Sequence, residues 1–369
     1  MDKHKIMKIC FIGPANSAHI IKWCNWFAAN GHEIHVISFT PGEIENATVH
    51  IIDVGVDTNG RDFAKIKYLF TGKQIKALVS DIKPDIVNVH YATSYGVATA
   101  LSGIKGYVLS VWGSDIYVFP RKSIIHRGLL KYSLKKADRL FSTSWAMAKE
   151  AAKYTNRKFD ITPFGVDVEL FNPDKRSRQT STPFTIGTVK GLSDIYGISD
   201  ILEAAAIIKK EESIPLMVRI AGKGPQEEEY RSLANKLGLS DIIEWLGFIS
   251  QEEAAKEWAN MDVAIIPSRQ ESFGVSALEA QACGTPVIIS DIPGLMEATK
   301  PGETSIVVKG NRAAAIADAV GKLYYDEQYR NQLAANGIDY VRNKYEINYC
   351  FKTIQTIYEE IINQDKGTI

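Results

Sequence analysis

The chain has 369 residues, of which 45% are hydrophobic and 23% charged, and its formal net charge is zero. This composition is typical of a folded globular protein and excludes an intrinsically disordered chain, and the length predicts two domains. No run of eighteen apolar residues occurs, so we expect no segment that spans a membrane.

The start of the sequence and its cysteines predict a cytoplasmic protein. Met1–Ile6 leads directly into an apolar strand and lacks the pattern of a secretory signal. The cysteines, Cys10, Cys24, Cys283 and Cys350, are scattered without the spacing of a metal site or a disulfide framework. We interpret them as small core residues in a reducing compartment.

Charge is distributed unevenly along the chain. Residues 1–170 carry 22 Lys and Arg against 15 Asp and Glu, a balance of +7, whereas residues 171–369 carry 21 against 28, a balance of −7. This asymmetry predicts two modules with different partners. A basic first half suits anionic lipid. It lacks the motifs and aromatic-rich patches of nucleic-acid binding, so we expect no nucleic-acid partner.

The first half alternates short apolar runs with amphipathic stretches, which predicts a doubly wound α/β domain. It opens with a strand over Lys8–Gly13, a helix over 18–29 and a strand over Glu33–Ser38. The loop from Gly13 to Ser17 lacks a three-glycine fingerprint, so a phosphate-binding loop and a plain tight turn remain alternatives. The other elements predicted in this half are strands over 49–54, 85–90, 107–111, 139–142 and 159–162 and helices over 63–82 and 145–154.

Two histidines of this half are candidates for binding a substrate. His90 ends a predicted strand, and ligands bind at the carboxyl ends of parallel strands. A structural, hydrogen-bonded histidine is the alternative at this position. His19 lies near the start of the helix over 18–29, where a role in capping that helix is the alternative.

The stretch from Arg121 to Arg139 is strongly basic and carries no acidic residue before Asp138. As a helix it would have an apolar stripe and a basic side. Such a helix can lie on an anionic membrane; alternatively, the stripe packs on the sheet and the lysines are solvated. The basic residues are at positions 121, 122, 127, 131, 135, 136 and 139, and the apolar ones are Ile124, Ile125, Leu129, Leu130 and Leu134.

A segment over 166–183, rich in Pro, Ser, Thr and charged residues, is predicted to link a domain of residues 1–165 to one of residues 184–345. The second domain repeats the α/β alternation. Its predicted strands are 184–189, 216–221, 242–246, 263–266 and 285–290, and its predicted helices are 199–211, 227–237, 251–259, 275–282, 312–324 and 327–343, followed by a last helix over 346–363.

The stretch most informative about function is Pro267–Gly284, P-S-R-Q-E-S-F-G-V-S-A-L-E-A-Q-A-C-G, between two buried strands. A helix that begins at Gly274 offers free N–H groups and partial positive charge to a phosphate, and glycine permits a close approach. Glu271 precedes this helix, and Glu279 lies within it. One carboxylate can hold the ribose diol of a nucleotide and the other the hydroxyls of an attached sugar. A solvated helix residue and a partner of the helix dipole are the alternatives.

The residues E-S-F-G-V-S-A-L-E-A-Q-A-C-G-T-P-V-I resemble the Glu–seven residues–Glu motif of the retaining GT-B glycosyltransferases, the glycosyl transferases group 1 family. The resemblance extends to Ile220–Pro225, Leu246–Ser250 and Pro163–Asp167. It implies a GT-B fold, with two doubly wound, Rossmann-like α/β domains facing each other across a cleft. The first would bind the acceptor and the second a nucleotide-sugar donor, and the helix over 346–363 would cross back to the first domain.

The resemblance also implies roles for individual residues. Glu271 would orient the transferred sugar, Glu279 would hold the ribose, and Lys190 would stabilise the leaving diphosphate. We predict Glu271, Lys190 and Asp115 as the catalytic residues. Further donor contacts are predicted at Gly13, Lys223, Ile249, Arg269, Phe273, Gly274 and Val275, and acceptor contacts at Asn16, Ser17, His19, His90 and Tyr91.

Two positions depart from the family pattern. Trp112 stands where many members have a histidine close to the transferred sugar, which leaves Asp115 as the nearest polar candidate. A helix cap or a turn is the alternative role for Asp115. Ile195 stands where the family has a second cation for the diphosphate, and losing that cation costs a few kcal/mol of transition-state stabilisation. Arg269, Lys223 and the helix start are candidates to compensate.

The implied reaction is glycosyl transfer with retention, to a glycan or polyprenyl-linked acceptor, in cell-surface polysaccharide synthesis. We expect the protein to be cytoplasmic, with possible peripheral contact between residues 121–139 and the anionic inner face of the plasma membrane. The sequence has no Asp-x-Asp pair that would let a divalent ion bridge the diphosphate, so we expect no metal and no other cofactor.

Two other classes of protein remain open. A nucleotide-sugar-binding pseudoenzyme, acting as the partner subunit of another glycosyltransferase, is favoured by Trp112 and Ile195 and opposed by Glu271, Lys190 and Glu279. A sugar-nucleotide epimerase on the same fold would need a group of general-base carboxylates and histidines, which the sequence does not bring together.

Overall fold

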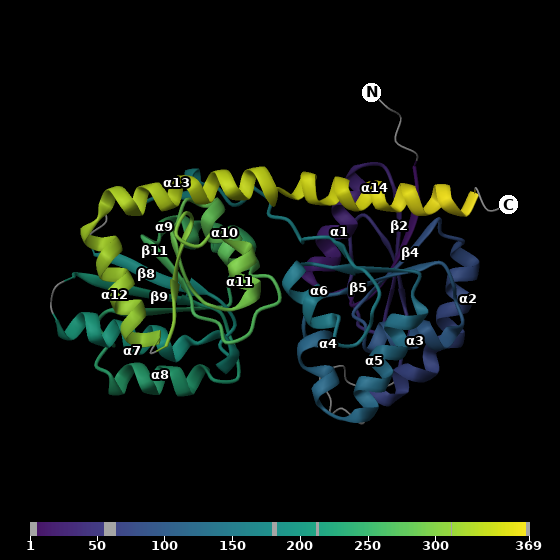
Figure 1. The fold of residues 1–369 in the computed structure, drawn as a ribbon, viewed down its shortest axis with the longest axis horizontal. Coiled ribbons are helices and arrows are strands. Elements are labelled where there is room, and N and C mark those ends of the chain that lie inside the picture. Colours follow the sequence, from purple (N-terminus) through teal and green to yellow (C-terminus); the bar gives the residue numbers. More distant parts are fainter. Residues whose placement is uncertain (1–5, 55–63, 179–182, 212–213, 311, 367–369) are drawn as a thin grey trace. The chain divides into compact units, whose positions relative to one another are not determined.

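The computed structural model describes residues 6–54, 64–178, 183–211, 214–310 and 312–366. The chain divides into two compact units, one of Met1–Pro163 with Phe351–Ile369 and one of Phe164–Cys350 (Figure 1). Each unit is a parallel sheet with helices on both faces. The predicted class, two doubly wound α/β domains, is therefore confirmed.

The first unit is built on a seven-stranded parallel sheet with the order β3-β2-β1-β4-β5-β6-β7. The strand order reverses at β1, which pairs with β2 on one side and β4 on the other, so a ligand-binding crevice is expected at the carboxyl ends of β1 and β4. All residues of β4 and β5 are buried, as in parallel strands covered on both faces. The strands are β1 (Lys8–Ile12), β2 (Glu33–Ser38), β3 (Thr48–Ile51), β4 (Ile86–His90), β5 (Tyr107–Val111), β6 (Arg139–Ser142) and β7 (Asp160–Ile161).

Helices cover both faces of this sheet (Figure 1). One face carries α2, α3 and α5, which pack side by side. On the other, Phe351 of α14 packs on Trp23 of α1, with ring centroids 5.5 Å apart, and the Tyr358 hydroxyl donates to Asn88 Oδ1 at 2.5 Å. The helices are α1 (Ala18–Ala29), η1 (Ala64–Thr71), α2 (Gly72–Ile82), α3 (Ser94–Ser102), α4 (Ser114–Tyr117), η2 (Phe119–Arg121), α5 (Ile124–Lys136) and α6 (Trp145–Ala151), with α14 (Ile347–Lys366) joining from Phe351 onward.

The second unit is built on a six-stranded parallel sheet with the order β10-β9-β8-β11-β12-β13. Its order reverses at β8, which places the loops after β8, β9 and β11 at one edge of the sheet. The strands are β8 (Phe184–Val189), β9 (Leu216–Ala221), β10 (Ile243–Gly247), β11 (Val263–Ile266), β12 (Val287–Ser290) and β13 (Ser305–Val308).

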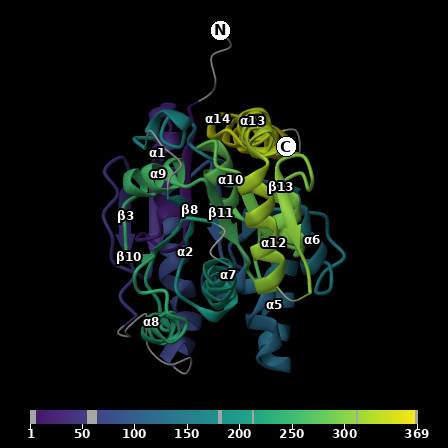
Figure 2. The ribbon, with the colours of Figure 1, turned by 90° about the vertical axis from the view of Figure 1, so that its left-hand side faces the viewer.

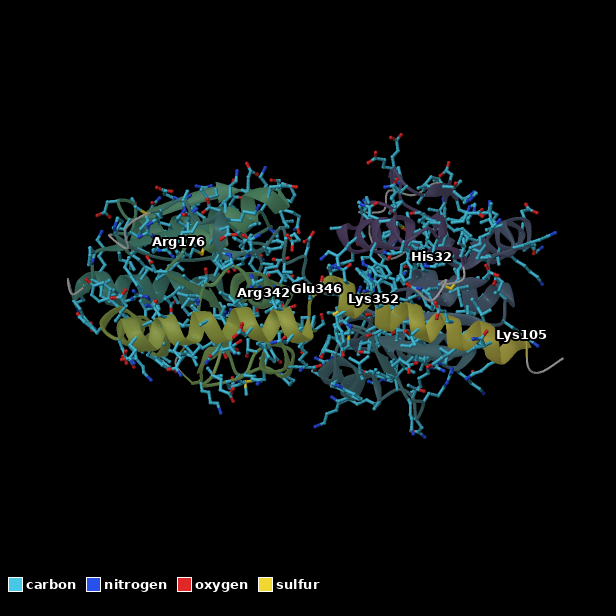
Figure 3. The ribbon with its side chains drawn as sticks, turned by 90° about the horizontal axis from the view of Figure 1, so that it is seen from above. His32, Lys105, Arg176, Arg342, Glu346 and Lys352 are labelled. Carbon is cyan, nitrogen blue, oxygen red and sulfur yellow. The ribbon has the colours of Figure 1, made fainter. Side chains whose placement is uncertain are left out.

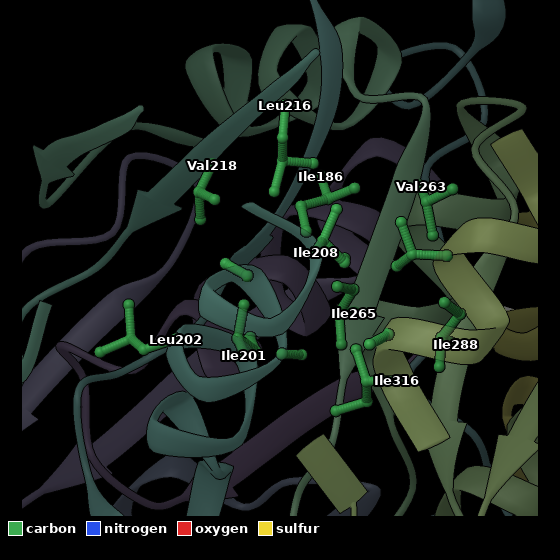
Figure 4. Packing of buried hydrophobic residues seen from close by; sticks show 14 of the residues in the cluster. Ile186, Ile201, Leu202, Ile208, Leu216, Val218, Val263, Ile265, Ile288 and Ile316 are labelled. Atoms are coloured by element: carbon green, nitrogen blue, oxygen red, sulfur yellow. The ribbon is translucent and has the colours of Figure 1, made fainter. Parts of the chain in front are cut away.

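In the second unit α7, α8 and α12 lie on one face of the sheet, and α9, α10 and α13 lie on the other (Figure 2). Between the sheet and α7 and α12, branched aliphatic side chains such as Ile186, Ile201, Ile265 and Ile316 interlock in a fully buried core (Figure 4). The helices are η3 (Pro173–Lys175), η4 (Asp194–Tyr196), α7 (Ile198–Lys210), α8 (Glu227–Lys236), α9 (Gln251–Asn260), α10 (Val275–Ala282), α11 (Pro293–Ala298), α12 (Arg312–Tyr325) and α13 (Glu327–Lys344).

The prediction of a single helix over 63–82 is wrong. From residue 64 onward the segment is η1 followed by α2, with the break at Gly72. A Cβ atom at Gly72 would lie 3.1 Å from the Ser102 backbone, so this glycine lets α2 approach α3 closely. Helices α3, α4 and α11 and strand β13 were not predicted, because elements this short give little periodic signal.

The segment predicted as a linker belongs, where it is described, to the second unit. Arg176 and Arg178 donate to opposite oxygens of the Asp262 carboxylate, each at 3.1 Å, and Arg176 lies among the side chains of this unit (Figure 3). The Asp262 side chain is 2% exposed, so these pairs anchor the segment to the start of β11. Residues 179–182 of the predicted linker, and residues 1–5 used to judge a secretory signal, lie outside the described residues.

The predicted apolar stripe of the basic helix is wrong at its start. Leu130 and Leu134 of α5 are buried, but Ile124 and Ile125 are exposed. The helix begins where the Ser123 hydroxyl accepts a hydrogen bond from the His126 amide at 3.3 Å. Among the helices of the described residues, none has the length and apolar character needed to cross a membrane.

Candidate active site

Three loops of the second unit meet at the carboxyl edge of its sheet. Lys190 follows β8, the glycine turn Gly222–Gly224 follows β9, and the loop 267–274 joins β11 to α10. Because β9, β8 and β11 are neighbours in the sheet, these loops lie side by side. This is the edge at which ligands bind in open parallel sheets.

Lys190 and Glu271 form an ion pair at the centre of this edge. Lys190 Nζ lies 2.6 Å from Glu271 Oε2, and it also donates to the Ser276 hydroxyl at 3.3 Å. The two charged side chains are only 12% and 14% exposed. The Tyr196 ring lies against the ammonium, with its centroid 4.7 Å from Nζ. The pair is therefore held on several sides, as a preorganised charge requires.

Lys190 keeps its charge in this setting. Burial acts to lower the pKa of Lys190, but the negative charge of Glu271 and its hydrogen bond outweigh burial and raise the pKa, with further contributions from Tyr196 and Glu279. Lys190 is therefore a buried ammonium that nearby carboxylates hold in its cationic form.

Glycines allow the first two loops to touch. A Cβ atom at Gly222, where φ is +136°, would lie 1.9 Å from the Lys190 carbonyl oxygen. The Leu192 amide donates to the Lys223 carbonyl at 3.0 Å, and the Gly222 amide donates to the Gly247 carbonyl at 2.6 Å. The loops after β8, β9 and β10 are thus joined backbone to backbone, which fixes the position of Lys190.

The start of α10 is equally tight. Gly274 precedes the helix with φ of +96°, and a Cβ atom there would lie 2.8 Å from Leu295 Cδ2. Phe273 is buried and packs edge-on against Tyr345, with ring centroids 5.3 Å apart. Val275 begins the helix and is half-buried, and the N–H groups of a first helical turn have no partner within the helix.

The other predicted donor residues are distributed around this centre. Glu279 is half-buried inside α10 and acts on the pKa of Lys190. Lys223 is exposed on the glycine turn, and Ile249 is half-buried in the loop between β10 and α9. Their predicted contacts with a donor remain predictions.

Arg269 and Ile195 bind each other through the backbone. The Arg269 amide donates to the Ile195 carbonyl at 2.7 Å, and the Arg269 guanidinium donates to the Asp194 carbonyl at 2.9 Å. The same guanidinium pairs with Asp200 at 3.3 Å. The side chain of Ile195 is left 42% exposed. A cation is therefore present on this loop pair, although its carboxylate partner offsets part of its charge.

The predicted acceptor residues lie in the first unit, around the ends of β1 and β4. Asn16 is exposed and accepts a hydrogen bond from the Thr40 hydroxyl at 3.3 Å. Ser17 precedes α1 without a capping bond from its side chain. Gly13, which was predicted as a donor contact, also lies in this unit and is buried. A Cβ atom there would lie 3.2 Å from His90 Cβ, so the loop after β1 packs on the end of β4.

His90 lies in a buried aromatic cluster. Its ring centroid is 4.9 Å from that of Trp23 and 4.6 Å from that of Trp112, and His19 packs edge-on against Trp112 at 5.5 Å. Burial lowers the pKa of His90 to about 3, and the neighbouring His19 adds to the effect. Among the described residues, neither ring nitrogen of His90 has a hydrogen-bond partner. The hydrogen bond expected of a structural histidine is therefore not made to the described residues, and the acceptor contact of His90 remains a prediction.

His19 and Tyr91 border this cluster. Burial, and then the charge of Lys22, lowers the pKa of His19 to about 4, so both histidines are neutral at physiological pH. Tyr91 adopts a left-handed backbone with φ of +70°, a conformation that non-glycine residues rarely take. Such strain is concentrated at functional sites.

Asp115 is hydrogen-bonded to the backbone around it. Its carboxylate accepts hydrogen bonds from the amides of Ala92 at 2.9 Å, Gly113 at 2.8 Å and Trp112 at 3.2 Å. Burial raises the pKa of Asp115, and these hydrogen bonds oppose that shift. The contacts are those of a residue that ties the loop after β5 to the loop after β4. Its catalytic role remains a prediction.

Sequence reasoning missed two residues that contact Lys190. Tyr196 and Ser276 both lie inside stretches singled out from the sequence, but neither carries a charge or a recognisable motif. Ser276 could have been predicted from its position in the first turn of α10, because first-turn side chains face the same ligand as the helix N–H groups.

Comparison with known proteins shows that the sequence matches two family models. The family described as "Glycosyl transferases group 1" matches residues 172–340, and that described as "Glycosyl transferase 4-like" matches residues 8–144. The second unit therefore matches the glycosyl transferases group 1 family over most of its length. The D-inositol 3-phosphate glycosyltransferase of Arthrobacter sp. (strain FB24) is 30% identical to this chain over 278 residues, covering 68% of it. The chain spans 64% of that relative's length, less than two thirds.

Solved structures of glycosyltransferases share the fold of this chain. Sucrose-phosphate synthase from Thermosynechococcus elongatus superposes with a TM-score of 0.84 at 19% identity, over 97% of this chain and 99% of that one. HepE from Anabaena, in complex with UDP and glucose, superposes with a TM-score of 0.78 at 16% identity, over 96% and 99%. At such identities the likeness shows the fold alone, and it confirms the predicted GT-B fold.

Proposed function

We propose that this chain is a retaining glycosyltransferase that moves a sugar from a nucleotide-sugar donor to a glycan or polyprenyl-linked acceptor in cell-surface polysaccharide synthesis. The observation that carries the proposal is the buried Lys190–Glu271 pair beside the start of α10. It combines a permanent cation, helix N–H groups and a carboxylate at one point. A diphosphate bonded to a sugar needs these three features together.

The contacts of Lys190 indicate how a donor would be held. Its ammonium has three N–H donors, of which Glu271 and Ser276 take two among the described residues. A phosphate oxygen would take the third and would also meet the N–H groups of Gly274 and Val275. Glu271 would then accept hydrogen bonds from the sugar, and Glu279, inside α10, would accept those of the ribose.

In the proposed reaction the acceptor oxygen forms its bond to the anomeric carbon on the face from which the diphosphate leaves. The glycosidic C–O bond to phosphate breaks with its electron pair, and a donor phosphate oxygen takes the acceptor proton. Negative charge grows on the diphosphate in this step. A cation already in place stabilises it without reorganisation, which is the largest single contribution to many enzymatic rates.

The comparisons support this proposal at the level of the family. HepE, which shares the fold, is a structure with UDP and glucose bound. We extend a nucleotide-sugar donor to this chain because the loops after β8 and β11 bring Lys190, Glu271 and the start of α10 together. We further propose that the protein acts in the cytoplasm, at the inner face of the plasma membrane, where polyprenyl-linked acceptors are found.

We propose that transfer needs no metal ion, because Lys190 and the start of α10 supply the positive charge that a divalent ion would otherwise bring to the diphosphate. EDTA should then leave the rate unchanged. Abolition of activity by EDTA, and its recovery with Mg²⁺ or Mn²⁺, would reject this part of the proposal.

A second function is favoured by one observation. Ile195, at the position of the family's second cation, is apolar and 42% exposed, and Arg269 beside it is paired with Asp200. A chain whose second cation is partly neutralised in this way can bind a nucleotide sugar without cleaving it. The alternative is therefore a nucleotide-sugar-binding pseudoenzyme that serves as the partner subunit of another glycosyltransferase.

The deciding experiment is nucleotide release from a panel of UDP-, GDP- and ADP-sugars by the purified chain, with EDTA present and with a membrane-lipid extract as the acceptor source. A Glu271→Ala variant is the matched control. Release from one donor, lost in the variant, would establish the transferase and name its donor. Tight binding of a donor without release would establish the pseudoenzyme instead.

A further inference from the structure

The N-terminal part of α5 presents apolar and basic side chains together on the surface of the first unit. Ile124 and Ile125, in the first turn, are 84% and 73% exposed. We define the α5 surface as these two isoleucines and the exposed basic residues around and beyond them. Those residues are Arg121, Lys122, Arg127, Lys131, Lys135 and Lys136.

The packing of the first unit does not explain why the two isoleucines are exposed. Leu130 and Leu134 already provide the buried side of α5, and Ser123 caps its first turn. Two adjacent branched apolar side chains that stay in water do not stabilise the folded unit. Ile124 and Ile125 are therefore suited to contact with an apolar environment outside the protein. A Cβ atom at Gly128, one turn further on, would meet no atom within 4 Å, so this glycine does not serve close packing inside the unit.

The charges around the isoleucines are of one sign. No acidic residue occurs between residues 116 and 137, which include six Lys and Arg. The residues that contact the α5 surface leave its charge mostly positive. Arg121 pairs with Glu150 of α6 at 3.1 Å, and Glu150 also pairs with Lys153, while Lys136 lies over the Tyr132 ring. The surface therefore remains cationic, with an apolar point at the start of the helix.

We propose that the α5 surface docks on an anionic lipid bilayer, with Ile124 and Ile125 entering the boundary between headgroups and acyl chains while the basic residues contact lipid phosphates. Apolar insertion beside cations distinguishes a bilayer from other anionic partners, because a nucleic acid or a soluble polyanion offers branched aliphatic side chains no apolar phase. This inference rests on the proposed function only in its biological reason, since a polyprenyl-linked acceptor would bring the protein to a membrane.

The test is flotation of the full chain with vesicles of phosphatidylcholine alone and of equal parts phosphatidylcholine and phosphatidylglycerol. We expect binding to the anionic vesicles, weakened by salt, and little binding to phosphatidylcholine. Ile124→Ser with Ile125→Ser should lower vesicle affinity roughly tenfold or more. Replacing Lys131, Lys135 and Lys136 by Gln should lower it about 100-fold, at about fivefold per cation.

The matched control is Leu101→Ser on α3, whose side chain is 48% exposed outside the α5 surface. It should leave vesicle binding unchanged. Unfolding midpoints of all variants should match the parent, because the altered side chains are exposed. Unchanged binding after loss of both isoleucines would overturn the proposal. A dimer in solution that this double variant dissociates, in a chain that does not bind vesicles, would assign the surface to a second copy of the chain.

Separate measurements test the membrane surface and the proposed function. Nucleotide release from a donor is measured on the same preparations with a water-soluble acceptor and without vesicles, where the isoleucine variant should keep the parent rate. Vesicle binding without nucleotide release would reject the transferase and keep the membrane surface. Nucleotide release without vesicle binding would reject the membrane surface and keep the transferase.

Discussion

Lys190 Nζ lies 2.6 Å from Glu271 Oε2, although 81 residues separate the two along the chain. They lie in the loops that follow β8 and β11, which are neighbouring strands of the sheet. Because the pair is almost fully buried, neither charge is stable there without the other or a ligand in its place. The pair thus keeps a cation ready for an anion at the carboxyl edge of the sheet.

Removing either charge should abolish most of the transfer. Lys190→Met removes the group that stabilises the leaving diphosphate, and we expect kcat to fall about 100- to 1000-fold. Glu271→Gln keeps the size of the side chain but removes its charge, and should lower kcat with little change in donor affinity. Nucleotide release at saturating donor measures both effects. A donor affinity lost in parallel with kcat for Glu271→Gln would place Glu271 in binding alone.

The same pair predicts a specific pattern of stability. Lys190→Met alone leaves a buried carboxylate unpaired and should lower the free energy of unfolding of the second unit by about 3 kcal/mol. The double variant Lys190→Met with Glu271→Leu should recover most of this loss, because no unpaired charge remains. Denaturant unfolding of the four proteins measures the coupling. Additive losses would show that the two side chains do not depend on each other.

Position 195 offers a gain of function. Ile195→Lys would add a second cation at a side chain that is 42% exposed, and so at little cost to folding. We expect nucleotide release to rise about tenfold, since each 1.4 kcal/mol of added transition-state stabilisation changes a rate tenfold. Ile195→Gln, of similar length and without charge, should leave the rate unchanged.

Arg269 decides how this result is interpreted. If its guanidinium supplies the second charge, Arg269→Gln should slow release, and Ile195→Lys should restore it in the double variant. Restoration in the double variant and no effect of Ile195→Lys alone would show that Arg269 already fills the role. No effect of either change would remove a second cation from the mechanism.

The second unit was predicted from sequence more completely than the contacts inside its site. The short strand β11 is fully buried in a parallel sheet, and the sequence shows it directly as an apolar run. Lys190 and Glu271 were singled out by a family motif, which gives their identity and not their contact. That Lys190 meets Ser276 and Tyr196 depends on loop conformation, and no periodic pattern encodes loop conformation.

Misplaced predictions in the first unit have a common physical origin. Ile124 and Ile125 continue the apolar periodicity of α5, so sequence alone places them in the stripe that Leu130 and Leu134 form. Only the position of the sheet decides where that stripe ends. The contacts of Asp115 could not be predicted either, because the three backbone amides around its carboxylate come together only in the folded chain. Its catalytic role remains a prediction.

Gly222 should not tolerate a side chain. Gly222→Ala would place a Cβ atom 1.9 Å from the Lys190 carbonyl oxygen at a φ of +136°, so the loop carrying Lys190 must move. We expect loss of more than about 2 kcal/mol of stability and loss of nucleotide release. Gly302→Ala is the control, because Gly302 also has a positive φ but no atom within 4 Å of its added Cβ. It should cost about 1 kcal/mol and keep activity.

His90 predicts how the stability of the first unit depends on pH. Its pKa is about 3 in the folded chain, below the ordinary value of 6.5, because burial disfavours the charged ring. The unfolded chain therefore binds a proton that the folded chain refuses between pH 6.5 and pH 3. Stability is complete above pH 6.5 and falls as the pH is lowered through this window, by about 2 kcal/mol at pH 5.

Other groups of the cluster also titrate, so the contribution of His90 is measured as a difference. His19, with a lowered pKa of about 4, acts in the same direction, whereas the raised pKa of Asp115 acts in the opposite direction. Comparing urea unfolding of the parent and of His90→Asn from pH 8 to pH 5 cancels both. The parent should lose about 2 kcal/mol more than the variant over this range. Equal losses would mean that His90 is protonated inside the folded unit, which its aromatic surroundings oppose.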